Sequence, residues 1–153
     1  MMKTVVITDT SFSDNEAEMI RIILSEGIDR VHIRKPGSTE SNFRRLIEAI
    51  PERFYPAVTL QDHVGLAVGY GIGGVHLNSR NPSVPAGFKG KVSRSCHSLE
   101  EVARCREEDY LFLSPVYNSI SKNGYRSAFT EKSLLESDGI IGPRVYALGG
   151  VKR

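Results

Sequence analysis

Short apolar segments alternate with helical segments along this chain, and the alternation limits the possible folds more than any other feature. The predicted strands are short and rich in β-branched or other apolar residues, and they span residues 4–7, 30–34, 57–60, 74–77, 91–95, 110–113 and 144–148. Helices are predicted from Ser13 or Asp14 to Gly27, from Thr39 or Ser41 to Pro51, over residues 62–70, after Ser98 and near Thr130. Strands that alternate with helices in this way form parallel sheets. The sequence therefore predicts an α/β fold.

Within the α/β class, the spacing of the segments favours a TIM (β/α)8 barrel. Each unit occupies about 22 to 30 residues, polar loops follow the strands, and no strand carries the G-x-G-x-x-G turn of a dinucleotide fold. Such a barrel needs eight strands and about 200 residues or more, whereas this chain has 153 residues. We expect one barrel domain over residues 1–153 that lacks its last β/α unit. An open barrel, or one closed by a partner, is the alternative.

The segment VHIRKP, residues 31–36, predicts where a ligand binds. Alternate side chains of a strand point to opposite faces, so His32 and Arg34 share one face while Val31 and Ile33 pack on the other. Pro36 ends the strand because proline has no N–H to donate. Arg34, with Lys35, is thereby delivered to the carboxyl end of a parallel strand, where α/β proteins bind ligands. A guanidinium there suits a phosphate, although two solvated surface charges are the alternative.

The other predicted strands also end in polar or glycine residues. These are Thr8 with Asp9, Gln61 with Asp62, Asn78, Ser95 with His97, Ser114 with Pro115, and the pair Gly149 and Gly150. The loop after the sixth strand adds Ser119, Ser121 and Lys122. Hydroxyls, cations and exposed glycine N–H groups are the parts of a phosphate site, and barrels often build such sites from their last two loops. We therefore predict a site for small phosphate esters.

The bulk composition excludes several other classes of protein. The residues are 40% hydrophobic and 25% charged with a net charge of +2, and no dense run of Lys or Arg points to nucleic acid. The first residues contain an apolar run too short for a membrane span. Cys96 and Cys105 lack metal-site spacing and are predicted to be reduced thiols, with Cys96 facing the helices. We expect a cytoplasmic protein without a nucleic-acid or membrane partner, which could form a homo-oligomer.

Taken together, the strand ends resemble the thiamine phosphate synthase family, including its TenI-type thiazole tautomerase branch. The resemblance covers nearly the whole chain and is carried by phrases in register: ITD at 7–9, VHIR at 31–34, LQD at 60–62, GVHL at 74–77, RSCHSLEE at 94–101, SPVY at 114–117, SISK at 119–122 and ALGG at 147–150. It implies an enzyme that joins hydroxymethylpyrimidine diphosphate to hydroxyethylthiazole phosphate and releases pyrophosphate. Stabilising the charge of the leaving pyrophosphate would then be the main task of the protein.

The resemblance also implies a role for each site residue. Arg34 matches the arginine that grips the pyrophosphate, Ser95 matches a hydroxyl near the substrate, and Asp62 matches a carboxylate that binds Mg²⁺. Phosphate binding falls to Lys35 and Gln61 at the strand ends, to Ser119, Ser121 and Lys122 in the loop after the sixth strand, and to Gly149 and Gly150. Arg34, Lys122, Ser95 and His32 form the predicted catalytic set.

The departures from the family pattern are equally specific. Pro36 stands where the family has a lysine, Gln61 replaces an asparagine, and Asn81 replaces the second Mg²⁺ carboxylate, which should weaken metal binding. Asp62 could instead cap the following helix. His32 is either a substrate-facing imidazole or an interior residue hydrogen-bonded to a neighbour, and His76 and His97 are expected to be structural.

Three functions are therefore compatible with the sequence. The first is a thiamine-phosphate synthase, which is a transferase. The second is a metal-free thiazole phosphate tautomerase, an isomerase with His32 or Gln61 near the proton transfer. The third is a protein that binds a thiazole or thiamine phosphate without turnover.

Overall fold

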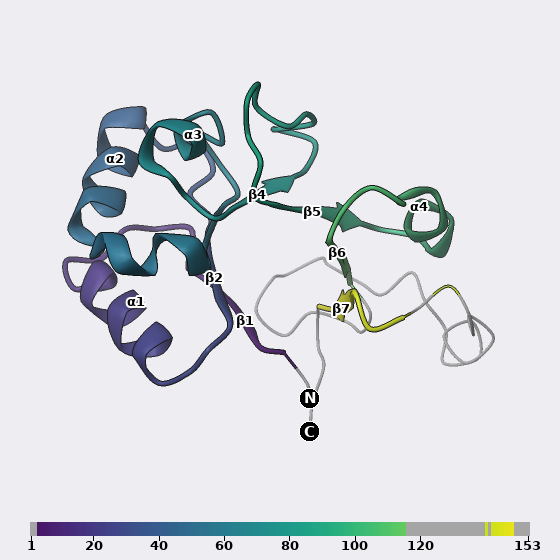
Figure 1. The fold of residues 1–153 in the computed structure, drawn as a ribbon, viewed down its shortest axis with the longest axis horizontal. Coiled ribbons are helices and arrows are strands. Elements are labelled where there is room, and N and C mark those ends of the chain that lie inside the picture. The colour runs from purple at the N-terminus through teal and green to yellow at the C-terminus, as the bar shows by residue number, and fades with distance from the viewer. Residues whose placement is uncertain (1–2, 116–139, 141, 149–153) are drawn as a thin grey trace. The chain divides into compact units, whose positions relative to one another are not determined.

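The protein is described by a computed structural model that covers residues 3–115, 140 and 142–148. The chain forms two compact units, residues 1–91 and 92–153. The helix predicted near Thr130 lies outside the described residues. Figure 1 shows the elements of both units with their labels.

The first unit is built on four parallel strands. They are β1 (Val5–Ile7), β2 (Arg30–Ile33), β3 (Val58–Leu60) and β4 (Gly74–Leu77), paired in chain order. His32 of β2 lies opposite Ile7 on one side and Thr59 on the other. Because all four strands run the same way, their carboxyl ends lie at one edge of the sheet. The polar residues that follow them are brought to this edge, as the sequence predicts.

Helices cover one face of these strands, as Figure 1 shows for α1 (Glu16–Ser25), α2 (Glu40–Ala49) and α3 (Leu66–Tyr70). Thr39 caps α2, since its hydroxyl accepts a hydrogen bond from the N–H of Asn42. Helix α1 begins later than expected, with Asn15 at its N-cap and no side-chain cap bond. A 3-10 helix, η1 (Glu52–Ala57), was not predicted; prolines at both its ends obscure any helical pattern.

The core of the first unit lies between the sheet and its helices. Val31, Ile33, Val58, Leu60 and Val75 are fully buried on the strands. The helices contribute buried apolar side chains at helical spacing, namely Ile20 and Leu24 of α1, Phe43, Leu46 and Ile47 of α2, and Ala67 of α3. This alternation leaves His32 on the opposite face of β2 from Val31 and Ile33, as the period of two requires.

The second unit contains β5 (Lys91–Cys96, which starts at the last residue of the first unit), α4 (Leu99–Arg104), β6 (Tyr110–Leu113) and β7 (Val145–Ala147). β5 pairs with β6, and β6 with β7, all parallel. The predicted cap at Ser98 is confirmed, because its hydroxyl accepts from the N–H of Glu101 at 3.1 Å. Cys96 is fully buried against α4 and β6 in an apolar cluster with Val102, Leu111 and Leu113. It faces the helix, as predicted.

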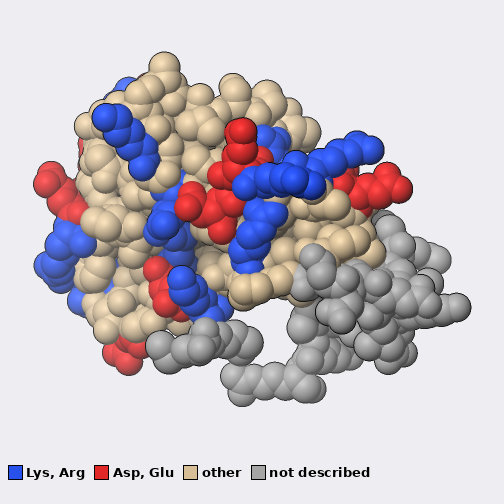
Figure 2. All heavy atoms as spheres, turned by 45° about the vertical axis from the view of Figure 1, so that its right-hand side comes forward, with Lys and Arg blue, Asp and Glu red and all other residues tan. Residues whose placement is uncertain are grey.

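The parallel α/β class is thus confirmed. Closure into an eight-stranded barrel and a single domain over residues 1–153 stay predictions. Within the part of the chain that is described, no helix is long and apolar enough to cross a membrane. On the face shown in Figure 2, Lys and Arg side chains lie among Asp and Glu side chains instead of forming one continuous basic surface.

Candidate active site

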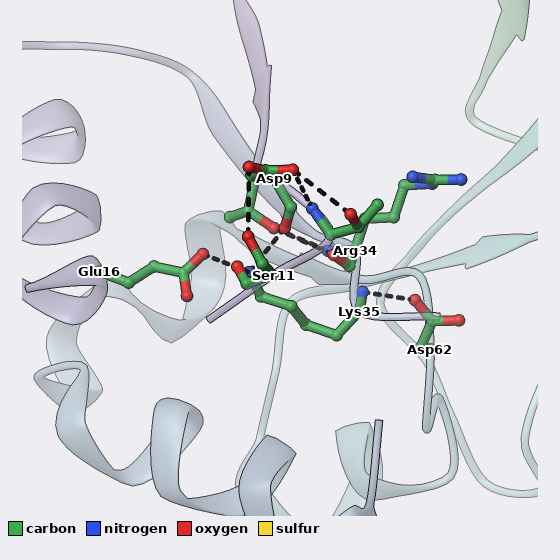
Figure 3. Close-up of polar contacts among 8 residues, drawn as sticks. Asp9, Ser11, Glu16, Arg34, Lys35 and Asp62 are labelled. Carbon is green, nitrogen blue, oxygen red and sulfur yellow. Dashed lines mark hydrogen bonds and ion pairs between the residues drawn. The ribbon is translucent and has the colours of Figure 1, made fainter. Parts of the chain in front are cut away.

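Arg34 lies at the carboxyl edge of the first unit's sheet and is held there through its backbone. Its N–H donates to the Thr8 hydroxyl at 3.0 Å, which joins the ends of β1 and β2. The side chain is part-buried, and no described residue makes a hydrogen bond with its guanidinium. Figure 3 shows this side chain extending away from Asp9 and Glu16. The group predicted to grip an anion is therefore presented with its N–H donors available.

Lys35 runs in the opposite direction from Arg34 (Figure 3) and is fully buried. Its ammonium lies 2.5 Å from Glu16 Oε1 and donates to the backbone carbonyls of Asp9 and Ser11 at 2.6 and 2.5 Å. An ammonium has three N–H donors, so protein oxygens occupy all of them. This placement of the Lys35 ammonium therefore does not support the phosphate contact predicted for it.

Asp62 follows β3 and joins three segments of the first unit. Its Oδ2 accepts the backbone N–H of Lys35 at 2.7 Å (Figure 3), and its Oδ1 accepts from Arg80 Nε at 3.1 Å. The alternative role as a helix cap is wrong, because α3 begins only at Leu66 with Gly65 as its N-cap. Asp62 thus ties the ends of β2 and β3 to the loop after β4.

That loop is a closed turn between Asn78 and Asn81. The two residues exchange backbone hydrogen bonds at 3.0 and 3.1 Å, and both side-chain amides donate to the Gln61 carbonyl at 3.1 Å. Asn78 Oδ1 accepts the N–H of Arg80 at 2.9 Å. The turn fixes the backbone of Arg80 beside Asp62.

His32 and Gln61 form a buried pair at the same edge. Gln61 Nε2 lies 2.9 Å from His32 Nδ1, and the His76 ring packs edge-on against His32 at 5.3 Å between centroids. Burial lowers the pKa of His32 well below its ordinary value of 6.5, and His76 and Arg30 act in the same direction. The imidazole is therefore neutral at pH 7. This is the interior placement that the sequence left open for His32. His76, which was expected to be structural, is also buried.

His63, directly after Asp62, adopts a left-handed backbone with φ of 47°. The residue is part-buried, its Nε2 donates to the Ser38 carbonyl at 2.8 Å, and its ring packs against Phe43 at 5.0 Å between centroids. A positive φ in a residue with a side chain is unfavourable and persists when surrounding contacts hold it. These contacts lock the chain at the position where Asp62 is presented.

The remaining predicted site residues belong to the second unit or lie outside the described residues. Ser95 lies near the end of β5 in the second unit, opposite Phe112. His97 of the same unit donates from Nδ1 to the Ser114 carbonyl at 3.1 Å, which agrees with the expected structural role. Five predicted phosphate contacts, Ser119, Ser121, Lys122, Gly149 and Gly150, lie outside the described residues.

The donor set does not fit the Mg²⁺ that the resemblance implies. Asp62 is already hydrogen-bonded through both oxygens, one of them to a guanidinium, and Asn81 contributes only a neutral amide. One carboxylate beside one guanidinium has no net negative charge, whereas Mg²⁺ is held by anionic oxygen ligands. Among the described residues, no group of three His, Cys, Asp or Glu side chains could hold a metal.

Two important residues were not predicted. Arg80 lies in a loop rich in Asn, Ser and Pro, and only its proximity to Asp62, 18 positions earlier, shows that it belongs to the site. Glu16 is the buried partner of Lys35 across 19 positions. The one signal in the sequence was the position of Arg80, next to Asn81 in the loop where the resemblance expects a metal ligand.

A family model described as thiamine monophosphate synthase matches residues 4–153. The chain belongs to this family. A solved structure described as thiamine phosphate pyrophosphorylase from Bacteroides thetaiotaomicron is 38% identical, with a TM-score of 0.86 over 98% of this chain and 73% of that one. Thiamine-phosphate synthases from Thermus thermophilus and Parasynechococcus marenigrum are 31% and 29% identical over 67% and 94% of this chain. The chain spans only 52% and 44% of the length of these two relatives.

Proposed function

We propose that this protein acts as a thiamine-phosphate synthase, a transferase on small phosphate esters. Membership of the thiamine monophosphate synthase family supports the proposal. The observation in this chain that supports the proposal is the placement of Arg34. Its backbone is held by Thr8 at the carboxyl edge of the sheet, and no described residue accepts a hydrogen bond from its guanidinium. We further propose that the whole site is built on a (β/α)8 barrel.

In the proposed reaction, the bond between the pyrimidine methylene carbon and the diphosphate oxygen breaks. Its electron pair leaves with pyrophosphate, and the thiazole nitrogen supplies the pair that forms the new C–N bond to the resulting cation. Charge therefore develops on the leaving oxygen, and a guanidinium placed there lowers the barrier. Arg34 holds the pyrophosphate in this scheme, and Lys122 is proposed to assist it. Ser95, Ser119, Ser121, Gly149 and Gly150 are proposed to orient the phosphates.

In this proposal the buried pair of His32 and Gln61 helps to form the site and does not act as a general acid. A neutral, fully buried imidazole whose Nδ1 accepts from Gln61 carries its single proton on Nε2. We assign His32 to positioning Gln61 at the substrate-facing edge.

The experiment is a turnover assay on the 153-residue protein with both substrates. Release of pyrophosphate with formation of the coupled product supports the synthase. Metal-independent aromatisation of the thiazole without pyrophosphate release would indicate the tautomerase instead, and tight ester binding without turnover would indicate a binding protein.

Arg34→Ala tests the assigned leaving-group site directly. The variant should lose pyrophosphate release by about 100-fold or more while its circular dichroism and melting temperature stay close to the parent, because the guanidinium makes no described hydrogen bond. Arg44→Ala is the matched control, since it also removes one guanidinium, from an exposed ion pair with Glu40 on α2. Normal turnover by Arg34→Ala would refute the assignment.

The cytoplasmic location, the absence of a nucleic-acid partner and a homo-oligomeric state remain predictions. Size-exclusion chromatography with light scattering checks the oligomeric state.

A further inference from the structure

Arg80 differs from Arg44 and Arg30 of the first unit in how many of its guanidinium nitrogens are hydrogen-bonded. Arg44 uses Nε, Nη1 and Nη2 for Glu40 and Tyr70, and Arg30 uses Nη1 and Nη2 for strand β3 and Pro56. Arg80 uses only Nε, for Asp62, and its side chain is 40% exposed. No described residue accepts from its two terminal nitrogens. A guanidinium fixed at one edge and open at the other presents two parallel N–H donors, which is the geometry that binds phosphate oxygens.

The position of this guanidinium is set by the surrounding residues. The Asn78 side chain holds the N–H of Arg80, and the turn from Asn78 to Asn81 is attached to the carbonyl of Gln61. Asp62, 8% exposed in its side chain, orients the guanidinium through Nε. Little conformational freedom remains to be lost when an anion binds.

The charges at this place differ from those of a metal site. A Mg²⁺ ion at Asp62 would lie beside the positive charge of Arg80, with Asn81 as a neutral neighbour in place of a second carboxylate. Like charges around one carboxylate repel each other. The guanidinium thus takes the position at Asp62 that a divalent cation would need.

We infer that Arg80, oriented by Asp62, binds the pyrophosphate group in place of a divalent metal ion, together with Arg34. The inference rests on the proposed function for the identity of the anion. It assigns the protein a metal-independent pyrophosphate site in which two arginines supply the positive charge.

The test is calorimetric titration of inorganic pyrophosphate into the metal-stripped protein in buffer containing EDTA, and again with Mg²⁺. The parent protein should bind pyrophosphate in EDTA. Arg80→Ala should weaken binding roughly 10- to 100-fold, the loss expected for charge-assisted hydrogen bonds to a phosphate. Arg80→Lys, which keeps the charge but loses the fork, should fall between the two. Arg44→Ala should bind like the parent.

Two results would overturn the inference. One is binding of pyrophosphate by the parent only when Mg²⁺ is present, and the other is unchanged affinity in Arg80→Ala. Melting temperatures of all variants, measured without ligand, separate lost binding from lost folding.

The turnover assay run in parallel separates this inference from the proposed function. Product formation that requires Mg²⁺ would support the synthase and overturn the role of Arg80. Pyrophosphate binding in EDTA that depends on Arg80, with no turnover of the two substrates under any condition, would support the arginine site and overturn the synthase.

Discussion

Lys35 Nζ lies 2.5 Å from Glu16 Oε1, and the two side chains are 0% and 10% exposed. The ion pair joins the end of β2 to the first residue of α1. Glu16 Oε2 is buried and has no hydrogen-bond partner among the described residues, so the carboxylate depends on Lys35 for its stabilisation. Removing one member of a buried pair leaves an uncompensated charge in a poorly solvated place.

Lys35→Met should therefore destabilise the protein by about 3–5 kcal/mol, measured by chemical denaturation. The double variant Lys35→Met with Glu16→Gln should be less destabilised than Lys35→Met alone, because no buried charge is left unpaired. Arg21→Ala, which breaks an exposed pair with Glu18 on the same helix, should change stability little. If Lys35→Met and the double variant were equally stable, the charge of Glu16 would have to be solvated in the folded protein.

The buried imidazole of His32 predicts a dependence of stability on pH. The pKa of His32 in the folded protein lies well below 6.5. Below pH 6.5 the His32 side chain therefore binds a proton more readily in the unfolded chain than in the folded protein. The contribution of His32 to stability is complete above pH 6.5 and is lost as the pH falls, by up to about 1.4 kcal/mol per pH unit. Denaturation midpoints from pH 7 to pH 5 should show this decline.

His32→Gln should make the pH dependence shallower over the same range, whatever its effect on stability at pH 7. His97→Gln is the control, since it also removes one histidine, from an exposed position away from the buried pair of His32 and Gln61. An identical slope in His32→Gln and the parent would mean that His32 is protonated in the folded state.

The two cysteines should differ in reactivity. Burial, together with the neighbouring thiol of Cys105, raises the pKa of Cys96 to about 12, and the two sulfur atoms lie 3.8 Å apart. At pH 8 only about 10⁻⁴ of the Cys96 thiol is ionised, so alkylation by iodoacetamide should be at least about 1000-fold slower than for an ordinary thiol. Mass spectrometry of the peptides identifies the modified residue. Both cysteines should react at similar rates in denaturant; rapid labelling of native Cys96 would contradict its burial.

The arrangement around Asp62 predicts that a metal site can be created. Arg80→Ser combined with Asn81→Asp removes the guanidinium and restores a second carboxylate in the turn. Mg²⁺ should then raise the stability of the double variant by about 1 kcal/mol at roughly five times its Kd. The parent protein should show no such effect, and Asn81→Asp alone a smaller one, because Arg80 still opposes the ion. Thermal melts with and without Mg²⁺ measure the difference.

Much of this architecture could be predicted from local patterns. The predicted strands agree with the observed strands to within one residue at each end. A buried parallel strand is a short apolar run, so it can be recognised without knowledge of its neighbours. The same reasoning placed Arg34 and Asp62 at one edge of the sheet, since residues after parallel strands share that edge. The helix caps at Thr39 and Ser98 could also be predicted from the sequence, because each is a local contact. Each hydroxyl accepts a hydrogen bond from a backbone N–H three residues later.

The sequence by itself determined the parallel α/β class and the residues that stand at the strand ends. Only the tertiary structure decided which way those side chains point and what they meet. Lys35, adjacent to Arg34, turns inward because Glu16 and two carbonyls accept its protons. Asp62 meets Arg80 because a turn 16 residues later is attached to Gln61. Such pairings depend on contacts between distant segments, and no local spacing encodes them.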